Sequence, residues 1–262
     1  TELTRTKQFM SQLQCSLTQL SDIAKNNLTE HSSQNIIDRI DDEQKKSLDF
    51  MYVAFEDKFR GSKEDIKEKI KVYLPYIQDN YDVSKPVLDV GCGRGEWLEL
   101  LKDNDMNAKG LDLNTIMVEE TKSLGLDVIN EDVITYLKKQ PDNSFSAITG
   151  FHIVEHLPFE VMVSLFKEAL RVLKEDGLVI FETPNPENIL VGAHYFYTDP
   201  THKNPLVPVT LEFILEYVGY SNVEIKRLHT YAQTANVEYT NDDLINNNFY
   251  NAMDFAVIGY KK

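Results

Sequence analysis

The fold of this chain is decided by one stretch, Pro86-Val87-Leu88-Asp89-Val90-Gly91-Cys92-Gly93-Arg94-Gly95-Glu96-Trp97. An apolar run over 87–90 leads into three glycines at alternating positions, and apolar residues at helical spacing follow from Trp97. This pattern predicts a strand, a tight turn and a helix. Glycine permits positive φ and a close approach of a ligand to the main chain. The turn is therefore a candidate nucleotide cradle at the carboxyl end of a first parallel strand.

Acidic residues at the ends of the next two strands narrow this prediction. The spacing D-x-G-x-G-x-G differs from the G-x-G-x-x-G register of dinucleotide folds, and no G-K-[ST] of a phosphate loop follows. Asp112 ends the apolar run 108–113, where a carboxylate can accept both hydroxyls of a ribose. Two carboxylates, Glu131 and Asp132, follow the run 126–129, and such a side chain can accept the exocyclic amine of adenine. A glycine-rich turn without a ligand is the alternative interpretation.

This ordered set, over about residues 85–185, resembles the class I S-adenosylmethionine-dependent methyltransferases. The resemblance implies an α/β fold with a doubly wound seven-stranded sheet, whose last strand is antiparallel, and S-adenosyl-L-methionine as the methyl donor. The cofactor-binding residues that we expect are Tyr52, Arg60, Asp89, Gly91, Cys92, Gly93, Gly95, Asp112, Leu113, Asp132, Val133 and Phe151.

Periodicity along the chain predicts an N-terminal extension. Apolar residues at helical spacing occupy 3–28 and resume at Ile36, with a polar linker over 26–35. We expect residues 1–47 to form a helical arm, which either mediates oligomerisation or folds back on the body, and residues 48–262 to form the methyltransferase domain. Further strands are expected at 146–151 and 177–183, a helix at 210–218, and an antiparallel pair at 222–228 and 254–260.

Composition narrows the class of protein. A net charge of −15 over 262 residues repels phosphate backbones, so a nucleic-acid partner is not expected. No apolar run approaches the roughly 20 residues of a transmembrane helix. Two cysteines, Cys15 and Cys92, provide no disulfide framework. These features fit a cytoplasmic protein without a transmembrane segment.

A second constellation follows the fourth predicted strand. If a helical turn starts at His152, then His152, Glu155 and His156 stand at i, i+3 and i+4 on one face. Two imidazoles and a carboxylate are good ligands for a divalent ion, and His202 or His194 in a later loop could supply a fourth. We expect a metal site at His152, Glu155, His156 and His202. The alternatives are His156 as a general base without metal, and a structural role.

The same pattern resembles two groups of metal-dependent enzymes, the ubiquinone-pathway O-methyltransferases and the plant small-RNA 3′-terminal methyltransferases. His152 stands where those enzymes carry Glu, which favours Mn²⁺ over Mg²⁺ because nitrogen ligands prefer softer ions. The resemblance implies that His156, His152 and Glu155 are the catalytic residues.

Four segments together resemble the methyltransferase modules of bacterial O-antigen and polysaccharide chain-terminating enzymes. They are the aromatic stretch 52–61, Phe151 to Pro158, Glu182 to Asn188, and Asp199 to Pro205. The resemblance implies metal-assisted O-methylation of a sugar hydroxyl at the non-reducing end of a lipopolysaccharide chain, a Kdo residue being one candidate.

The same resemblance implies which partners the protein has and where in the cell it acts. It implies a glycan acceptor, a homo-oligomer or a larger glycan-assembly polypeptide joined through the N-terminal helices, and a cytoplasmic location that can be peripheral at the inner membrane. Two alternatives stay open. One is an O-methyltransferase acting on a quinone-like phenol, and the other is a non-catalytic methyltransferase-like scaffold that works through its N-terminal helices.

Overall fold

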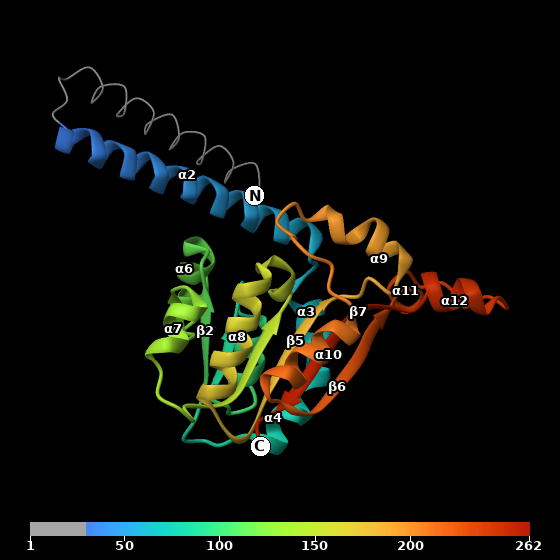
Figure 1. Cartoon of the computed structure of the whole chain (residues 1–262). Coiled ribbons are helices and arrows are strands. Elements are labelled where there is room, and N and C mark those ends of the chain that lie inside the picture. The colour runs from blue at the N-terminus through green and yellow to red at the C-terminus, as the bar shows by residue number, and fades with distance from the viewer. Residues whose placement is uncertain (1–29) are drawn as a thin grey trace. The chain divides into compact units, whose positions relative to one another are not determined.

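The computed structural model describes the backbone of residues 30–262 and the side chains from residue 43 onward (Figure 1). The predicted helix at 3–28 lies outside the described residues. The chain divides into two compact units between Ala54 and Phe55, a few residues beyond the predicted boundary at 47 and 48. The second unit, Phe55–Lys262, carries every strand of the sheet described below.

The long helix α2 (Glu30–Phe59) begins inside the predicted polar linker. The linker prediction is therefore wrong for residues 30–35. This segment is polar but contains neither glycine nor proline, so nothing in it breaks a helix.

The second unit is built on one seven-stranded sheet, as predicted. Its strands are β1 (Val87–Val90), β2 (Ala108–Asp112), β3 (Val128–Asn130), β4 (Phe145–Phe151), β5 (Leu173–Pro184), β6 (Ser221–Thr230) and β7 (Ala252–Tyr260). The strand order is β3-β2-β1-β4-β5-β7-β6, and β7 runs antiparallel to both of its neighbours. Register places Asp89 of β1 beside Gly110 of β2 and Thr149 of β4.

Helices connect the strands and cover both faces of the sheet. They are α3 (Lys63–Ile70), α4 (Leu74–Asn80), α5 (Glu96–Lys102), α6 (Thr115–Ser123), α7 (Val133–Lys139), α8 (Phe159–Val172), α9 (Ile189–Ala193), α10 (Pro208–Val218), α11 (Tyr231–Thr234) and α12 (Asp243–Phe249). Short 3₁₀ turns lie at Lys71–Tyr73, Val154–His156 and Tyr195–Thr198. Ser62 accepts a hydrogen bond from the backbone N–H of Asp65 and so caps α3.

Alternating side chains of the central strands build a core on each face. Leu88 and Ile148 pack with residues of α7, α8 and α10, which lie in front of the sheet in Figure 1. Val87 and Ala147 pack on the other face with residues of α3, α4 and α5. Both cores are closed to solvent, since these four side chains are at most 1% exposed. Burial on both faces explains the continuous apolar runs in the sequence.

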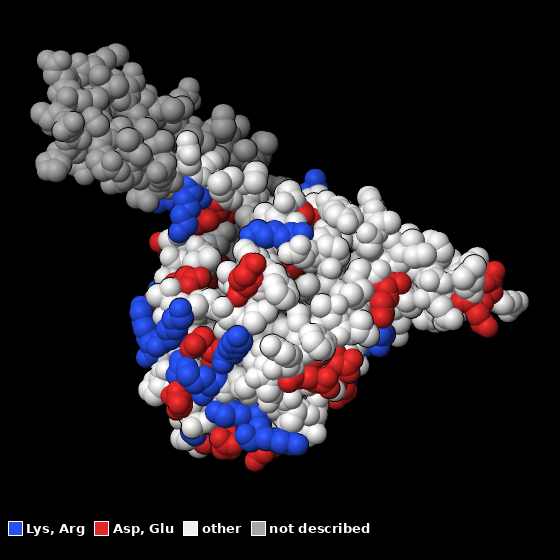
Figure 2. All heavy atoms as spheres, in the orientation of Figure 1, with Lys and Arg blue, Asp and Glu red and all other residues white. Residues whose placement is uncertain are grey.

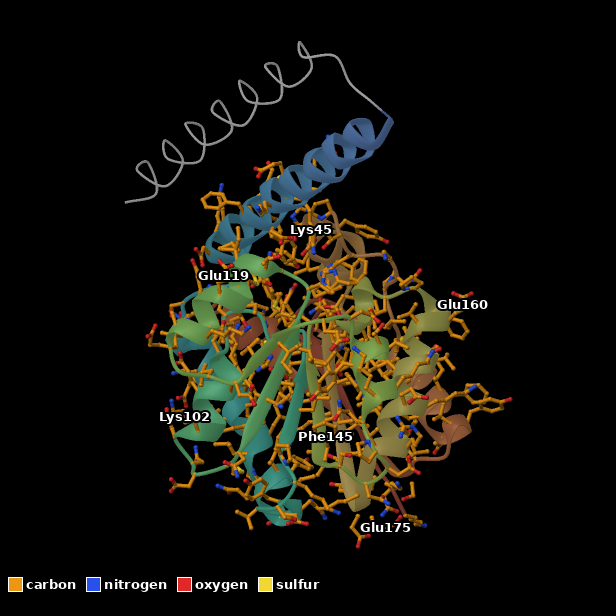
Figure 3. The ribbon with its side chains drawn as sticks, turned by 90° about the vertical axis from the view of Figure 1, so that its left-hand side faces the viewer. Lys45, Lys102, Glu119, Phe145, Glu160 and Glu175 are labelled. Atoms are coloured by element: carbon orange, nitrogen blue, oxygen red, sulfur yellow. The ribbon has the colours of Figure 1, made fainter. Side chains whose placement is uncertain are left out.

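The carboxyl ends of the parallel strands meet at one edge of the sheet. Figure 3 separates the two ends: Phe145 begins β4 at the lower end, whereas Glu160, in the first turn of α8, lies near the opposite end. The glycine turn after β1 and the loops after β2, β4 and β5 all lie at the upper edge. Ligands of doubly wound sheets bind at this edge.

Two features of the surface bear on partners. Among the described residues, no helix is long and apolar enough to cross a membrane. On the face drawn in Figure 2, Lys and Arg side chains are interspersed with Asp and Glu and form no continuous basic surface.

Candidate functional site

The glycine turn between β1 and α5 has the geometry that its sequence predicts. Gly91, Gly93 and Gly95 have φ of 70°, 49° and 81°, a region that disfavours side chains. A Cβ on Gly95 would lie 2.6 Å from Cγ2 of Thr121 in α6. The backbone N–H of Gly91 donates to the carbonyl of Leu111 over 2.8 Å, which ties the turn to β2.

Asp112 is held directly beside this turn. Its Oδ2 accepts the N–H of Gly93 and its Oδ1 the N–H of Asn114, both at 2.8 Å. Burial raises the pKa of the Asp112 carboxyl, and the two N–H donors oppose that shift. The next side chain, Leu113, is 58% exposed and provides an apolar surface beside the carboxylate. This placement suits the predicted contact with a ribose and an adenine ring.

Asp89 lies at the bottom of a cavity against the same turn. It is 2% exposed and accepts a hydrogen bond from Thr149 Oγ1 over 2.8 Å. Burial raises the pKa of Asp89 to about 7, although Thr149 and Arg60 oppose the rise. The residues lining the cavity are Arg60, Ile66, Ile70, Asp89, Gly91, Cys92, Glu96, Trp97 and Phe151.

Two predicted cofactor residues also have structural roles. The Oδ1 of Asp132 accepts the N–H and the hydroxyl of Thr135, each at 2.9 Å, so Asp132 caps α7 and Val133 is its first residue. Cys92 packs against Gly110, where a Cβ would lie 2.6 Å from Sγ, and burial raises the pKa of the thiol well above its usual value. Cys92 is therefore a small filler of the turn.

Arg60 lies at the start of the second unit and lines the cavity that contains Asp89. Its Nη1 lies 3.0 Å from Oε1 of Glu56, one helical turn earlier in α2. Tyr52 belongs to the other compact unit, so its contact with a cofactor stays a prediction.

A cluster of potential metal ligands lies beyond β4 and β5. Glu155 is fully buried, and its Oε2 accepts the hydroxyl of Thr183 over 2.9 Å. Its Oε1 is buried and accepts no hydrogen bond among the described residues. Burial raises the pKa of Glu155, but the adjacent His152 outweighs it and holds the pKa below its usual value. Oε1 also lies 3.2 Å from Nδ1 of His152, an ion pair that lacks hydrogen-bond geometry, so it keeps lone-pair capacity that a cation can use.

Two imidazoles approach this carboxylate. The rings of His156 and His202 lie 4.7 Å apart, and Nε2 of His202 lies 3.9 Å from Oε1 of Glu155. One ligand atom from each of Glu155, His156 and His202 lies within 4.8 Å of the others. Burial lowers the pKa of His156, which keeps that ring neutral and able to accept a proton or an ion. These three residue types fit a divalent transition metal.

His152 does not join that set in the way its sequence spacing predicts. Its φ is 59°, so the helical turn begins only at Val154 and has 3₁₀ geometry. Nδ1 of His152 lies 3.2 Å from Glu155 Oε1, while Nε2 lies 3.4 Å from Glu182 Oε1. Burial lowers the pKa of His152, but these carboxylates outweigh it and raise the pKa to about 10. Both ring nitrogens of a charged His152 are donors, which support Glu155 and Glu182. His152 also forms a second group of potential metal ligands with Glu182 and Asp254, and coordination of a metal by His152 stays a prediction.

His152 and Glu182 belong to a second cluster of polar side chains, which also contains Tyr73, His229 and Asp254. The sequence did not predict Tyr73, Glu182, His229 or Asp254 as site residues. Tyr73 of the 3₁₀ turn after α3 donates its hydroxyl hydrogen to Oε2 of Glu182. On the other side, Nδ1 of His229 lies 3.0 Å from Oδ2 of Asp254. The ends of the predicted strands 177–183 and 254–260 were the available signal, because Glu182 and Asp254 lie there. His194, the alternative fourth ligand, is exposed beside Tyr195.

Comparison with known proteins adds independent evidence. A family model described as a methyltransferase domain matches residues 60–225. A solved structure of an S-adenosylmethionine-dependent methyltransferase from Archaeoglobus fulgidus is 33% identical, with a TM-score of 0.73, and the alignment covers 80% of this chain and 99% of that one.

Curated relatives match over a shorter region. A ubiquinone biosynthesis O-methyltransferase from Actinobacillus pleuropneumoniae is 28% identical over 138 residues, which cover 47% of this chain and 58% of the relative. A protein with the same description from Yersinia enterocolitica is 30% identical over 122 residues, covering 42% of this chain and 49% of the relative. The chain thus spans about half the length of these curated relatives.

Proposed function

Because this chain belongs to the methyltransferase domain family, we propose that it transfers a methyl group from S-adenosyl-L-methionine to a hydroxyl oxygen, with a divalent ion at Glu155, His156 and His202. The observation that carries the proposal is the convergence of these three side chains at the same sheet edge as the glycine turn. The acceptor that we propose is a sugar hydroxyl at the end of a bacterial surface polysaccharide.

The proposed binding site for the methyl donor consists of the glycine turn, Asp112 and Asp89. We place the nucleoside of the donor against the turn over Gly91 to Gly95, whose positive φ angles disfavour side chains, and we expect Asp112 to accept the ribose hydroxyls. We place the amino-acid end of the donor beside Asp89, which lines the cavity against the turn. Methyl transfer requires chiefly that the acceptor oxygen lie in line behind the electrophilic methyl carbon, so fixing both substrates supplies much of the rate.

The acceptor side depends on Glu155, His156 and His202. A bound divalent ion would favour the deprotonated form of the acceptor hydroxyl and fix its position. Glu155 is held by Thr183 and His152, so its carboxylate cannot swing away. His156 is neutral and can accept the hydroxyl proton if no ion takes that role.

A sugar acceptor is supported by the loop that follows β5. The rings of Tyr195 and Tyr197 are 39% and 63% exposed in the 3₁₀ turn that precedes His202, and such rings offer an apolar face with a polar hydroxyl. A phenolic precedent comes from the curated relatives, whose names refer to ubiquinone biosynthesis. That acceptor is the second candidate.

Transfer of an isotopically labelled methyl group tests both. The purified chain is incubated with labelled donor and separate panels of terminal saccharides and catechol-type phenols, with and without chelator. We expect label on a saccharide, loss of transfer in chelator, and better recovery with Mn²⁺ than with Mg²⁺. Label on phenols alone would select the second candidate. No donor binding by calorimetry would favour the scaffold interpretation.

A further inference from the structure

A carboxylate from α2 lies over the glycine turn without a role in the function proposed above. The Oε1 of Glu56 pairs with Arg60 at 3.0 Å. Its Oε2 is buried and accepts no hydrogen bond among the described residues. A Cβ placed on Gly93 would lie 3.8 Å from this Oε2 and 3.7 Å from Arg60 Nη1. Glu56 therefore directs a free carboxylate oxygen at the main chain on which we place the donor.

Glu56 adds negative charge to a site that already holds the carboxylates of Asp112, Asp89 and Glu96. Burial raises the pKa of Asp112, and the charge of Glu56 acts in the same direction. Asp89 and Glu96 line the small cavity against the turn, and Arg60 is the single basic residue in that lining. A site of this charge attracts a cation, and the attraction is strengthened by partial burial.

The two forms of the donor differ by one charge at the sulfur atom. The sulfonium of S-adenosylmethionine is positive, whereas the thioether of the product S-adenosylhomocysteine is neutral. Apart from this charge, the two molecules differ only by the transferred methyl group. A negative residue beside the site therefore favours the donor over the product by its charge alone.

We propose that Glu56 is a donor-selecting residue, whose carboxylate favours the sulfonium cation over the neutral product. The proposal rests on the donor site proposed above. It assigns to the α2 end a function in donor exchange: the carboxylate stabilises the bound donor before transfer and loses that attraction when the sulfur becomes neutral.

Calorimetric binding of three ligands tests the proposal. They are S-adenosylmethionine, S-adenosylhomocysteine and sinefungin, which carries an ammonium group near the position of the sulfonium methyl. Glu56→Gln keeps the shape and the acceptor for Arg60 but removes the charge. We expect it to weaken both cationic ligands by about fivefold to twentyfold and to change the product's dissociation constant less than twofold.

Matched variants separate charge from structure. Asp57→Asn removes the same charge from the neighbouring residue, whose carboxylate is half exposed and pairs with Arg94 at 3.2 Å. We expect this variant to keep the wild-type ratio of product to donor dissociation constants. Glu56→Asp retains the charge and should keep most of the ratio, which checks the result if Glu56→Gln unfolds.

The outcomes are distinct. Equal weakening of all three ligands, an unchanged ratio in Glu56→Gln, or the same change of ratio in Asp57→Asn would overturn the role of Glu56 while leaving the donor site in place. A wild-type chain that binds none of the ligands would overturn the donor site and this inference together.

Discussion

Nδ1 of His202 lies 2.6 Å from the carbonyl oxygen of Phe196. Because a carbonyl oxygen only accepts hydrogen bonds, Nδ1 must carry the proton, and the lone pair of the neutral ring lies on Nε2. That nitrogen is the one near Glu155, at 3.9 Å. Backbone contacts of this kind orient the histidines of metal sites. The loop after β5 thus presents His202 in the tautomer that an ion requires.

Replacement of His152 by Asn tests its role as a buried cation. The folded-state pKa of about 10 lies above the usual 6.5, so the charged ring stabilises the fold fully below pH 6.5. That contribution declines between pH 6.5 and about 10. Urea unfolding of both proteins at pH 6, 8 and 10 should show a stability difference that shrinks as the pH rises. A difference that is constant with pH would reject this role.

The Asp112→Ala variant tests the ribose contact. Loss of a charged acceptor for hydroxyl groups should weaken donor binding by about 1–3 kcal/mol. Calorimetry measures the dissociation constant directly. Asp132→Ala removes a predicted adenine contact and, in addition, the α7 cap, whose loss should lower the free energy of unfolding by about 1 kcal/mol. An unchanged dissociation constant in Asp112→Ala would remove this residue from the donor site.

Donor binding should depend on pH through Asp89. Its pKa of about 7 means that the carboxyl is largely protonated at pH 6 and ionised at pH 8. Because the donor carries a sulfonium, it should bind the ionised form more tightly, so the dissociation constant should fall as the pH rises from 6 to 8. Binding at pH 6.5 should release a proton, detectable from calorimetry in buffers of different ionisation enthalpy. The Asp89→Asn variant should lose this proton release, and its retention there would assign the proton to another group.

The sequence predicts the sheet well because its signals are local. The apolar run ending at Val90 and the glycines that follow define a strand and turn without reference to the rest of the chain. The insertion of β7 between β5 and β6 depends on pairings between distant segments, such as Glu182 with Ala256, and the strand order came from the family resemblance.

For the candidate site, too, the sequence predicted some features and not others. The spacing of Glu155 and His156, with a later His202, correctly indicated groups that the structure brings together. The prediction that a helical turn starts at His152 was wrong. The residue has a left-handed backbone conformation, and its N–H donates to the carbonyl of Glu182 over 2.9 Å. Tyr73 reaches Glu182 across 109 positions of the chain, a contact that no local pattern encodes.

The central claim is that Glu155, His156 and His202 hold a divalent ion, and a titration with Mn²⁺ followed by electron paramagnetic resonance tests it most directly. Metal-free wild-type protein should bind one Mn²⁺ per chain, while Glu155→Gln and His202→Ala should each weaken binding at least about tenfold, because each removes a ligand. His194→Ala, whose ring is exposed beside Tyr195, should bind as the wild type does. No binding by the wild-type chain, or equal binding by all four proteins, would contradict the claim and leave His156 as a general base without metal.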